Sequence, residues 1–516
     1  MDVETPSRLS KRPAAIVIGG GIAGLATALR LSAGGMSVTL LERHNHMGGK
    51  IRTVPSAAGP VDAGPTVLTL RHVFDDLFAC AGERLEDHVT LMRQDILARH
   101  FWSDGSQLDL HADPETTASA IAEFAGHKSA EEFRQFNWRA RQLFDAFDIP
   151  MMQAAKPKVP RLALEVLRHP RLLRAMAPLS TLSQMLDNQF SDPRLSQLFG
   201  RYATYVGGAP HLSPAILSLI WQAEAAGIWV IQGGMQRLAT ALTALAINRG
   251  VIMRTNTHVD KITLDNGAVS GIEINGSEHL RAKFIVYAGD PRALAKGKLG
   301  SDLCGIAPQT LTIPRSFSAR VHSFAACQTR PDLSHHNVFF ADTPQSEFDD
   351  LMAGRIPSDP TLYLCAEDRG HGTPVPPLER FEIISNAPAT ETLTPPMDLD
   401  TWHHQIMQRL ADFQVTLSPK PSMTTITTPQ HFAQMFPETM GALYGQSPHG
   451  LTASLRRPTA RTKIPGLWLA GGGTHPGAGL PMATLSARHA AEAILSAQTS
   501  TSLSDPTAMR GGMSTA

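Results

Sequence analysis

Cysteine is scarce in this chain of 516 residues, which contains only Cys80, Cys304, Cys327 and Cys365. None of them forms a CxxC pair, so the sequence excludes a disulfide scaffold and a cysteine-based zinc site. Histidine is more frequent, at 21 residues, but no HExxH pattern is present, and we predict no metal site. Scattered thiols of this kind are typical of buried free cysteines in a reducing compartment.

The chain also lacks an excess of charge of either sign. Lysine plus arginine and aspartate plus glutamate both number 46, which argues against a nucleic-acid partner held by bulk positive charge. No uninterrupted apolar run reaches the roughly 18 residues of a membrane span. Residues 1–13 carry basic side chains but no apolar segment of the secretory kind. We therefore expect neither a transmembrane helix nor secretion.

Glycine, in contrast, is plentiful and gathers in stretches with informative spacing. Residues 14–43 read AAIVIGGGIAGLATALRLSAGGMSVTLLER. The apolar run at 15–18 predicts a buried parallel strand, residues 25–31 predict a helix, and residues 37–41 predict a second strand. The turn between the first strand and the helix has the spacing GxGxxG and is formed by Gly19, Gly21 and Gly24.

Each glycine of this turn has a role in binding a dinucleotide. Gly19 permits the tight turn, Gly21 lets the backbone approach a pyrophosphate, and Gly24 permits close helix–strand packing. The helix start, which includes Ala23, offers free N–H groups to the phosphates. Glu42 follows the second strand and can accept both hydroxyls of an adenosine ribose, which disfavours NADP. A purely structural turn is the alternative, but the elements that follow in register favour a dinucleotide.

A second glycine-rich stretch, GGGTHPGAGLPMA, lies near the end of the chain. Residues 465–470 predict a short strand before it, and residues 482–495 predict a helix after it. This arrangement again directs a helix N-terminus at an anionic or electron-rich group. No second GxGxxG follows a strand, so the sequence indicates one dinucleotide rather than two.

The glycine stretches resemble those of the FAD-dependent amine oxidase and phytoene desaturase superfamily, and within it those of the carotenoid desaturases. Further segments in the same order carry the resemblance: Gly48-Gly49-Lys50, DAGPTV at 62–67, THV at 257–259, YAGDP at 287–291 and SLRRP at 454–458. Gly289 departs from the pattern, because asparagine is usual there. Segments YATYVGG and FDAFDIPMM most resemble the 1-hydroxycarotenoid 3,4-desaturases.

The resemblance implies FAD as the cofactor and assigns roles to individual residues. Gly48, Gly49 and Lys50 would meet the cofactor and its phosphates, and Val259 would contact adenine through its backbone. The remaining positions that the resemblance places at the cofactor are Thr66, Val67, Asp290, Gly473 and Met482.

The implied fold is α/β, with a discontinuous Rossmann-type FAD-binding domain and an α+β substrate domain. Residues 251–287 alternate with period two around a turn at 265–267, which predicts a β-meander on the FAD-binding domain. We expect the FAD-binding domain at 1–110, 225–300 and 450–498, the substrate domain at 111–224 and 301–449, and a disordered tail at 499–516.

The implied reaction introduces a C-3,4 double bond into an acyclic 1-hydroxycarotenoid in carotenoid biosynthesis. Hydride would leave an allylic carbon for the flavin, and a proton would leave the adjacent carbon. Asp148 and His475 are candidate proton acceptors, although a turn carboxylate before Pro150 and a structural hydrogen bond in the glycine loop are the alternatives. Quinone or oxygen would be the final electron acceptor. The alternative functions are a phytoene or neurosporene desaturase, an FAD-dependent carotenoid isomerase, and a non-catalytic flavin-binding protein.

Residues 156–186 form a basic segment with leucine and valine at helical spacing. Between Lys156 and Arg174 there are six lysines or arginines and one acidic residue, Glu165. Such a helix can lie in the interface of an anionic membrane, and a surface helix with a solvated basic face is the alternative. A substrate found only in lipid favours a peripheral enzyme on the cytoplasmic side of the membrane.

Overall fold

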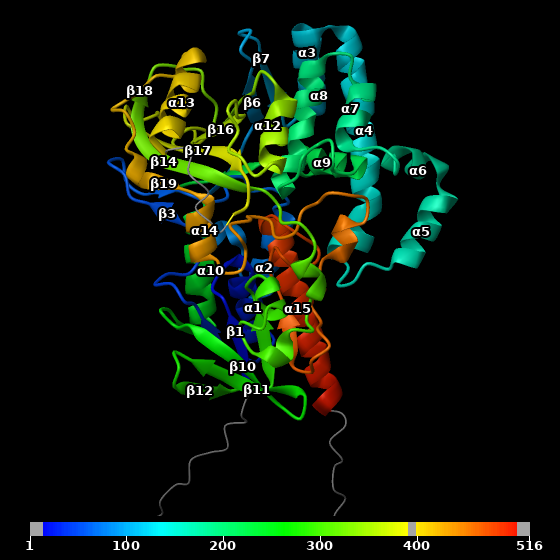
Figure 1. Ribbon diagram of the computed structural model, residues 1–516, viewed down its shortest axis with the longest axis vertical. Helices are drawn as coiled ribbons and strands as arrows, with labels where there is room; N and C mark the ends of the chain where they lie inside the picture. The colour runs from blue at the N-terminus through cyan, green and yellow to red at the C-terminus, as the bar shows by residue number, and fades with distance from the viewer. Residues whose placement is uncertain (1–13, 391–398, 503–516) are drawn as a thin grey trace, which may run out of the picture.

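The computed structural model describes residues 14–390 and 399–502. Two domains are stacked along the long axis of the molecule, and the chain passes between them several times (Figure 1). The predictions made for residues 1–13 and for the tail at 503–516 lie outside the described residues.

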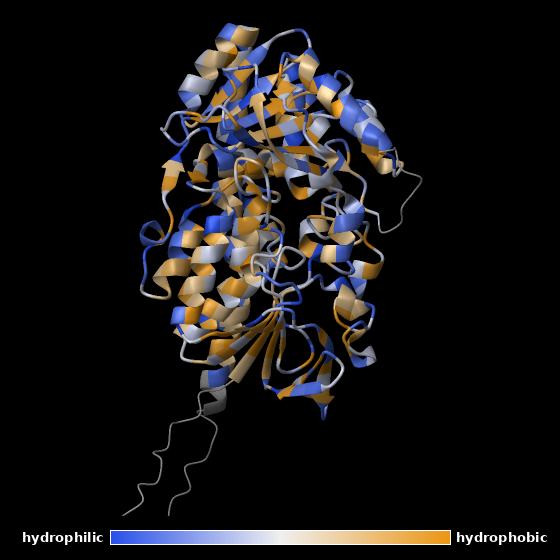
Figure 2. Cartoon of the chain, turned by 90° about the vertical axis from the view of Figure 1, so that its left-hand side faces the viewer, coloured by the Kyte–Doolittle hydropathy of each residue, from blue (hydrophilic) through white to orange (hydrophobic). Residues whose placement is uncertain are grey.

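The first domain is built on a parallel sheet of five strands in the order β20-β13-β1-β2-β9. All of its strands except the partly exposed edge strand β9 are buried along most of their length, which explains why they are continuous apolar runs rather than alternating ones. In Figure 2 they are largely orange, and the helices beside them mix orange with blue. The strands are β1 (Ala14–Ile18), β2 (Ser37–Leu41), β9 (Ile252–Arg254), β13 (Phe284–Tyr287) and β20 (Leu467–Leu469).

Helices and a meander cover the two faces of this sheet. Helices α1 (Ile22–Ala33), α10 (Gln236–Asn248) and α15 (Leu480–Ser502) share one apolar cluster with the sheet. Strands β10 (Val259–Asp265), β11 (Ala268–Ile274) and β12 (Glu278–Arg281) share another. The turn from β10 to β11 has positive φ at Asn266 and Gly267, as the sequence predicted for a tight hairpin.

The second domain contains a mixed sheet of eight strands in the order β18-β14-β17-β16-β15-β6-β7, with β19 paired to β14. One face packs against helices α3, α4, α7, α8 and α9, and the other packs against α13. The strands are β6 (Ile96–Phe101), β7 (Gln107–His111), β14 (Ser318–Gln328), β15 (His336–Phe339), β16 (Leu362–Ala366), β17 (Glu379–Ala387), β18 (Leu417–Ser418) and β19 (Ile426–Thr427).

The helices of this domain are α3 (Pro114–Ala125), α4 (His127–Phe147), α7 (Leu182–Gln189), α8 (Pro193–Gly200), α9 (Ile220–Ala225), α12 (Pro344–Met352) and α13 (Leu399–Asp412). The shorter elements elsewhere are α2 (His72–Ala79), α11 (Arg292–Ala295), α14 (Pro429–Met435), β3 (Thr53–Val54), β4 (Val61–Asp62), β5 (Leu91–Arg93) and β8 (Trp229–Ile231).

The structure places elements differently from the predicted domain ranges at two points in the chain. Strand β6 and most of β7 fall inside the range 1–110 but join the eight-stranded sheet, because β6 pairs in parallel with β15. A partner more than 200 residues away in sequence leaves no local signal. At the other end, α15 continues to Ser502, so residues 499–502 are helical.

Two short helices, α5 (Val159–Arg168) and α6 (Pro170–Met176), project from the second domain as an arm (Figure 1). They coincide with the basic segment found in the sequence. Among the described helices, none combines the length and the apolarity needed to cross a membrane.

Candidate active site

A cavity of about 890 Å³ lies where the two domains meet, at the carboxyl ends of β1 and β13. Ligands of open α/β sheets bind at this edge, beside the point where the strand order reverses. Most of the residues that the sequence assigned to the cofactor line it: Gly19, Gly21, Ala23, Glu42, Gly48, Gly49, Lys50, Thr66, Val67, Val259, Asp290 and Gly473.

Two of the predicted cofactor residues are not among the described lining residues, and each lies close behind them. A Cβ on Gly24 would lie 1.8 Å from the carbonyl oxygen of Gly19, so α1 packs directly on the glycine turn. This is the close helix–strand approach that the sequence assigned to Gly24. Met482 packs in a small cluster with Leu70, Val73 and Leu485. Both residues therefore lie behind the residues that line the cavity.

The Gly48-Gly49 pair is held against the first glycine turn. The backbone N–H of Gly48 donates to the carbonyl of Gly20 at 2.8 Å. A Cβ on Gly49 would lie 2.9 Å from the Cα of Gly21, which leaves no room for a larger residue. The Gly48-Gly49 pair and the first glycine turn therefore form one cradle in which backbone atoms face the cavity.

Glu42 is buried and lines the cavity at the end of β2. Its Oε2 accepts a hydrogen bond from the N–H of Gly20 at 2.7 Å, and its Oε1 accepts one from the N–H of His44 at 2.8 Å. These bonds fix the carboxylate at the rim of the glycine turn. This is the position in which it can accept ribose hydroxyls.

The C-terminal glycine loop is fixed by contacts from both sides. Arg457 donates to the carbonyl of Gly472 at 2.5 Å and to the carbonyl of Tyr444 at 3.0 Å. Ser486 accepts the N–H of Gly471 at 2.7 Å. Gly479 and Leu480 line the cavity where α15 begins, so the positive end of that helix dipole faces the cavity.

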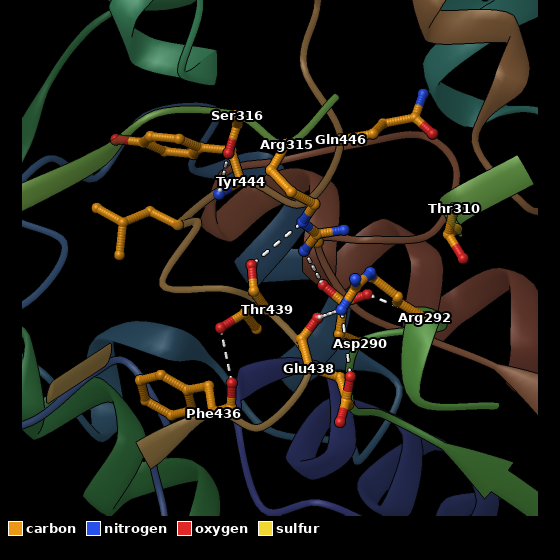
Figure 3. Close-up of polar contacts among 12 residues, drawn as sticks. Asp290, Arg292, Thr310, Arg315, Ser316, Phe436, Glu438, Thr439, Tyr444 and Gln446 are labelled. Carbon is orange, nitrogen blue, oxygen red and sulfur yellow. Dashed lines mark hydrogen bonds and ion pairs between the residues drawn. The ribbon is translucent and has the colours of Figure 1, made fainter. Parts of the chain in front are cut away.

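A polar network at the lip of the cavity joins the two domains (Figure 3). Arg315 forms an ion pair with Asp290, and its Nε donates to the carbonyl of Thr439 at 3.1 Å. Arg292 pairs with Glu438 at 3.2 Å. The sequence predicted only Asp290 in this network, because its partner Arg315 lies 25 residues away in another segment and Glu438 lies still further along the chain.

Lys50 is the one lysine of the cradle predicted to meet phosphates. Its Nζ donates to the carbonyl of Leu443 at 2.5 Å and lies 5.6 Å from the centre of the Phe436 ring. Burial lowers the pKa of Lys50 to about 8, partly offset by the charge of Asp290. A buried cation of this kind is suited to an anionic ligand that replaces its lost hydration.

These features together fit FAD. The glycine backbones form a cradle that any Cβ at Gly49 would fill, Glu42 is fixed at the rim of the glycine turn, where it is predicted to meet the ribose, and Lys50 supplies a cation. A helix N-terminus stands at each glycine loop.

Neither predicted proton acceptor is among the described residues that line the cavity. Asp148 begins the segment Asp148–Gln153 and accepts a hydrogen bond from Gln153 at 3.0 Å. His475 is buried, and its Nε2 is bonded to the carbonyl of Ala154 at 2.9 Å. Burial lowers the pKa of His475. The assignment of either residue to proton removal stays a prediction.

The second domain supplies the opposite wall of the cavity. Val338, Tyr363, Ile384 and Val321 lie side by side across β15, β16, β17 and β14 and line it. Arg201, Tyr205 and Glu224 line it from the helical side. The sequence offered no signal for these residues beyond the segments that carried the resemblance.

One buried group has the composition of a metal site. Ligand atoms of His335, His336 and Cys365 lie within 4.8 Å of one another. All three also take part in hydrogen bonds: Cys365 Sγ lies 3.4 Å from His335, and His336 Nδ1 lies 2.6 Å from the hydroxyl of Tyr363. The absence of a metal site, predicted from the sequence, stays a prediction.

The chain matches the family described as flavin containing amine oxidoreductase over residues 22–495. It is 51% identical over 483 residues to a protein named hydroxyneurosporene desaturase from Cereibacter sphaeroides, covering 94% of this chain and 97% of that protein. Proteins of the same name from Rhodobacter capsulatus and Rubrivivax gelatinosus are 46% and 40% identical, and each match covers at least 93% of both chains.

Solved structures with the same fold are more distant in sequence. Cyclohexylamine oxidase from Brevibacterium oxydans has a TM-score of 0.58 at 17% identity, covering 95% of this chain and all of that one. Putrescine oxidase bound to putrescine has a TM-score of 0.59 at 14% identity, covering 94% of this chain and 99% of that one. These likenesses concern the fold alone.

Proposed function

We propose that this chain, which belongs to the flavin containing amine oxidoreductase family, is an FAD-dependent carotenoid desaturase that introduces the C-3,4 double bond into acyclic 1-hydroxycarotenoids. The observation that carries the proposal is the cavity: a dinucleotide cradle forms one wall and an apolar sheet face forms the other. Three relatives named hydroxyneurosporene desaturase, 40–51% identical over nearly the whole chain, support the substrate class.

FAD, when bound, supplies a hydride acceptor for the allylic carbon of the substrate. The residues of this chain bind FAD and the carotenoid, align the two, and exclude water from the cavity. The apolar row Val338, Tyr363, Ile384 and Val321 gives an extended surface against which a polyene can pack. Because the polyene itself delocalises the positive charge that develops, alignment and a dry wall are the main requirements.

The start of α15 and Lys50 place positive potential at the cofactor side of the cavity. The helix dipole stabilises negative charge that gathers there during the reaction, and Lys50 is predicted to meet the phosphates. Asp148 and His475 remain the predicted proton acceptors. Electrons pass finally to a quinone or to oxygen.

The first test is an assay of substrate choice. Purified protein with FAD is given lipid-dispersed 1-hydroxyneurosporene, neurosporene or phytoene, and products are separated by chromatography and identified by absorption. We expect a red-shifted product with one more conjugated double bond from the hydroxylated carotenoid alone. Conversion of phytoene or neurosporene instead would assign the alternative desaturase function, and an unreduced flavin with every carotenoid would indicate a non-catalytic flavin protein.

The arm formed by α5 and α6 is the surface that we propose meets the membrane, on its cytoplasmic side. Leu164 and Leu167 are 47% and 69% exposed there, and Leu179, just beyond α6, is 98% exposed. Exposed basic residues accompany them: Lys156, Lys158, Arg168, Arg171 and Arg174. Apolar side chains beside basic ones are typical of a surface that lies in an anionic lipid interface.

Replacing both Leu164 and Leu167 by glutamine is expected to weaken binding to anionic vesicles about tenfold, since each leucine contributes buried apolar area. Co-sedimentation of the FAD-loaded protein with vesicles measures this. The control is Ile247→Gln, which changes a side chain of similar exposure, 53%, on α10 of the other domain. Equal loss of vesicle binding in both variants, or no loss in either, would contradict a membrane contact at the arm.

A further inference from the structure

Three polar side chains line the substrate half of the cavity, close to its apolar row. Arg201 and Tyr205 belong to the segment Arg201–Val206, and Glu224 belongs to α9. The side chains of Arg201 and Glu224 are only 9% and 2% exposed. A buried ion pair is a poor stabilising device, because the desolvation of both charges offsets their attraction. Its place on a cavity wall points instead to a ligand.

The hydrogen bonds within this cluster leave one hydrogen-bond donor without a partner. Arg201 lies 3.5 Å from Glu224 and donates to the hydroxyl of Tyr205 at 2.8 Å. Tyr205 and Tyr202 both donate to the Glu224 carboxylate. The Nε of Arg201 is buried and has no hydrogen-bond partner among the described residues. An unused donor beside acceptor oxygens is what an alcohol needs, because it accepts one hydrogen bond and donates another.

The cluster borders the end of the cavity where the cofactor is predicted to react. The hydroxyl of Tyr363 donates to Oγ1 of Thr66 at 2.8 Å, and Thr66 is a predicted flavin neighbour. Val67, Tyr205 and Tyr363 pack against one apolar cluster.

The chemistry of the proposed substrate requires a polar group at this place. In a 1-hydroxycarotenoid, carbon 1 carries the hydroxyl, and carbons 3 and 4 lose the hydrogens. Only carbon 2 separates the hydroxyl carbon from the reacting pair. When carbons 3 and 4 lie at the hydride acceptor, the hydroxyl lies beside the flavin and not at the far end of a tunnel.

We propose that Arg201, Tyr205 and Glu224 bind the tertiary hydroxyl of the carotenoid, an assignment that rests on the proposed function. The Arg201 guanidinium donates to the hydroxyl oxygen, and the hydroxyl donates to the Glu224 carboxylate or the Tyr205 oxygen. This contact holds carbons 3 and 4 in register with the cofactor. A carotenoid without the hydroxyl leaves the Arg201 donor buried and unpaired, so the site disfavours it.

Two tyrosine variants separate recognition from a structural role. Tyr202 and Tyr205 both donate to Glu224, but only Tyr205 is among the described residues that line the cavity. Tyr205→Phe is expected to lower kcat/KM for 1-hydroxyneurosporene about tenfold and to weaken its binding as much, with little effect on neurosporene binding. Tyr202→Phe is expected to lower thermal stability and leave this selectivity unchanged. Binding is followed by the absorption shift of the carotenoid, independently of turnover.

A double variant, Arg201→Leu with Glu224→Leu, preserves the fold by exchanging a buried pair for apolar groups. It is expected to bind the two carotenoids with equal affinity. Retained preference for the hydroxylated carotenoid in this variant and in Tyr205→Phe overturns the assignment, as do equal effects of Tyr202→Phe and Tyr205→Phe. Wild-type protein that does not convert 1-hydroxyneurosporene overturns the proposed function itself, and the assignment with it.

Discussion

Replacing Gly21 by alanine is expected to weaken FAD binding about a hundredfold while leaving the apoprotein as stable as wild type. Gly21 has φ −69° and ψ 178°, a conformation that any residue adopts. The nearest atom to an added Cβ would be the Cα of Gly49 at 3.9 Å, so the protein alone has room for it. A bound pyrophosphate does not leave that room, and displacing it breaks about two charge-assisted hydrogen bonds from the backbone. Flavin fluorescence titration and melting of the apoprotein measure the two quantities.

Two further glycine variants serve as comparisons for Gly21→Ala. In Gly24→Ala the added Cβ would meet the Gly19 carbonyl at 1.8 Å, so the apoprotein itself is expected to melt at a lower temperature. Gly200→Ala is the matched control, since Gly200, at the end of α8, is not among the described residues that line the cavity and its Cβ would touch Pro210 at an ordinary 3.6 Å. If Gly21→Ala bound FAD as tightly as Gly200→Ala does, the pyrophosphate would not lie on this turn.

The part of the site that could be predicted is the part encoded in short segments. The turn at Gly19, Gly21 and Gly24, with the carboxylate of Glu42 behind it, depends on a strand, a helix and a second strand that follow one another directly. Backbone conformation there is dictated locally, and the predicted strand at residues 37–41 coincides with β2. The hairpin around residues 265–267 was predictable for the same reason.

The rest depends on contacts between segments that are distant in the chain. Arg315 reaches Asp290 and Thr439, and Arg52 reaches Thr427, across segments with no periodic or motif signal. Glu224 reads in the sequence as an ordinary helical residue between alanines. Its burial against Arg201 becomes visible only when α9 packs beside the segment that follows α8.

The eight-stranded sheet holds a second feature that the sequence could not reveal, a polar row across its cavity-facing side. His336, Cys365, Glu382 and Ser323 are paired in register across β15, β16, β17 and β14, two residues along from the apolar row that lines the cavity. Both carboxylate oxygens of Glu382 are buried without a hydrogen-bond partner among the described residues. Burial raises the pKa of Glu382 well above its ordinary value, the charges of Glu367 and Asp62 raise it further, and Arg52 opposes them.

A pKa raised in this way means that the folded protein binds a proton on Glu382 more tightly than the unfolded chain does. The free energy of unfolding falls as pH rises from the unfolded pKa of about 4.3 towards the folded pKa, by about 1.4 kcal/mol per pH unit for this one group. Glu382→Gln keeps the shape of the side chain and removes the titration. We expect the variant to match wild type in melting temperature near pH 4 and to exceed it increasingly towards pH 8.

Melting of the FAD-loaded protein across this range measures the difference. Glu492→Gln, which changes a carboxylate that is 62% exposed on α15, is the control and is expected to shift the melting temperature little at any pH. Parallel pH profiles for Glu382→Gln and wild type would mean that Glu382 is charged in the folded protein. The opposing charge of Arg52 would then outweigh the effect of burial.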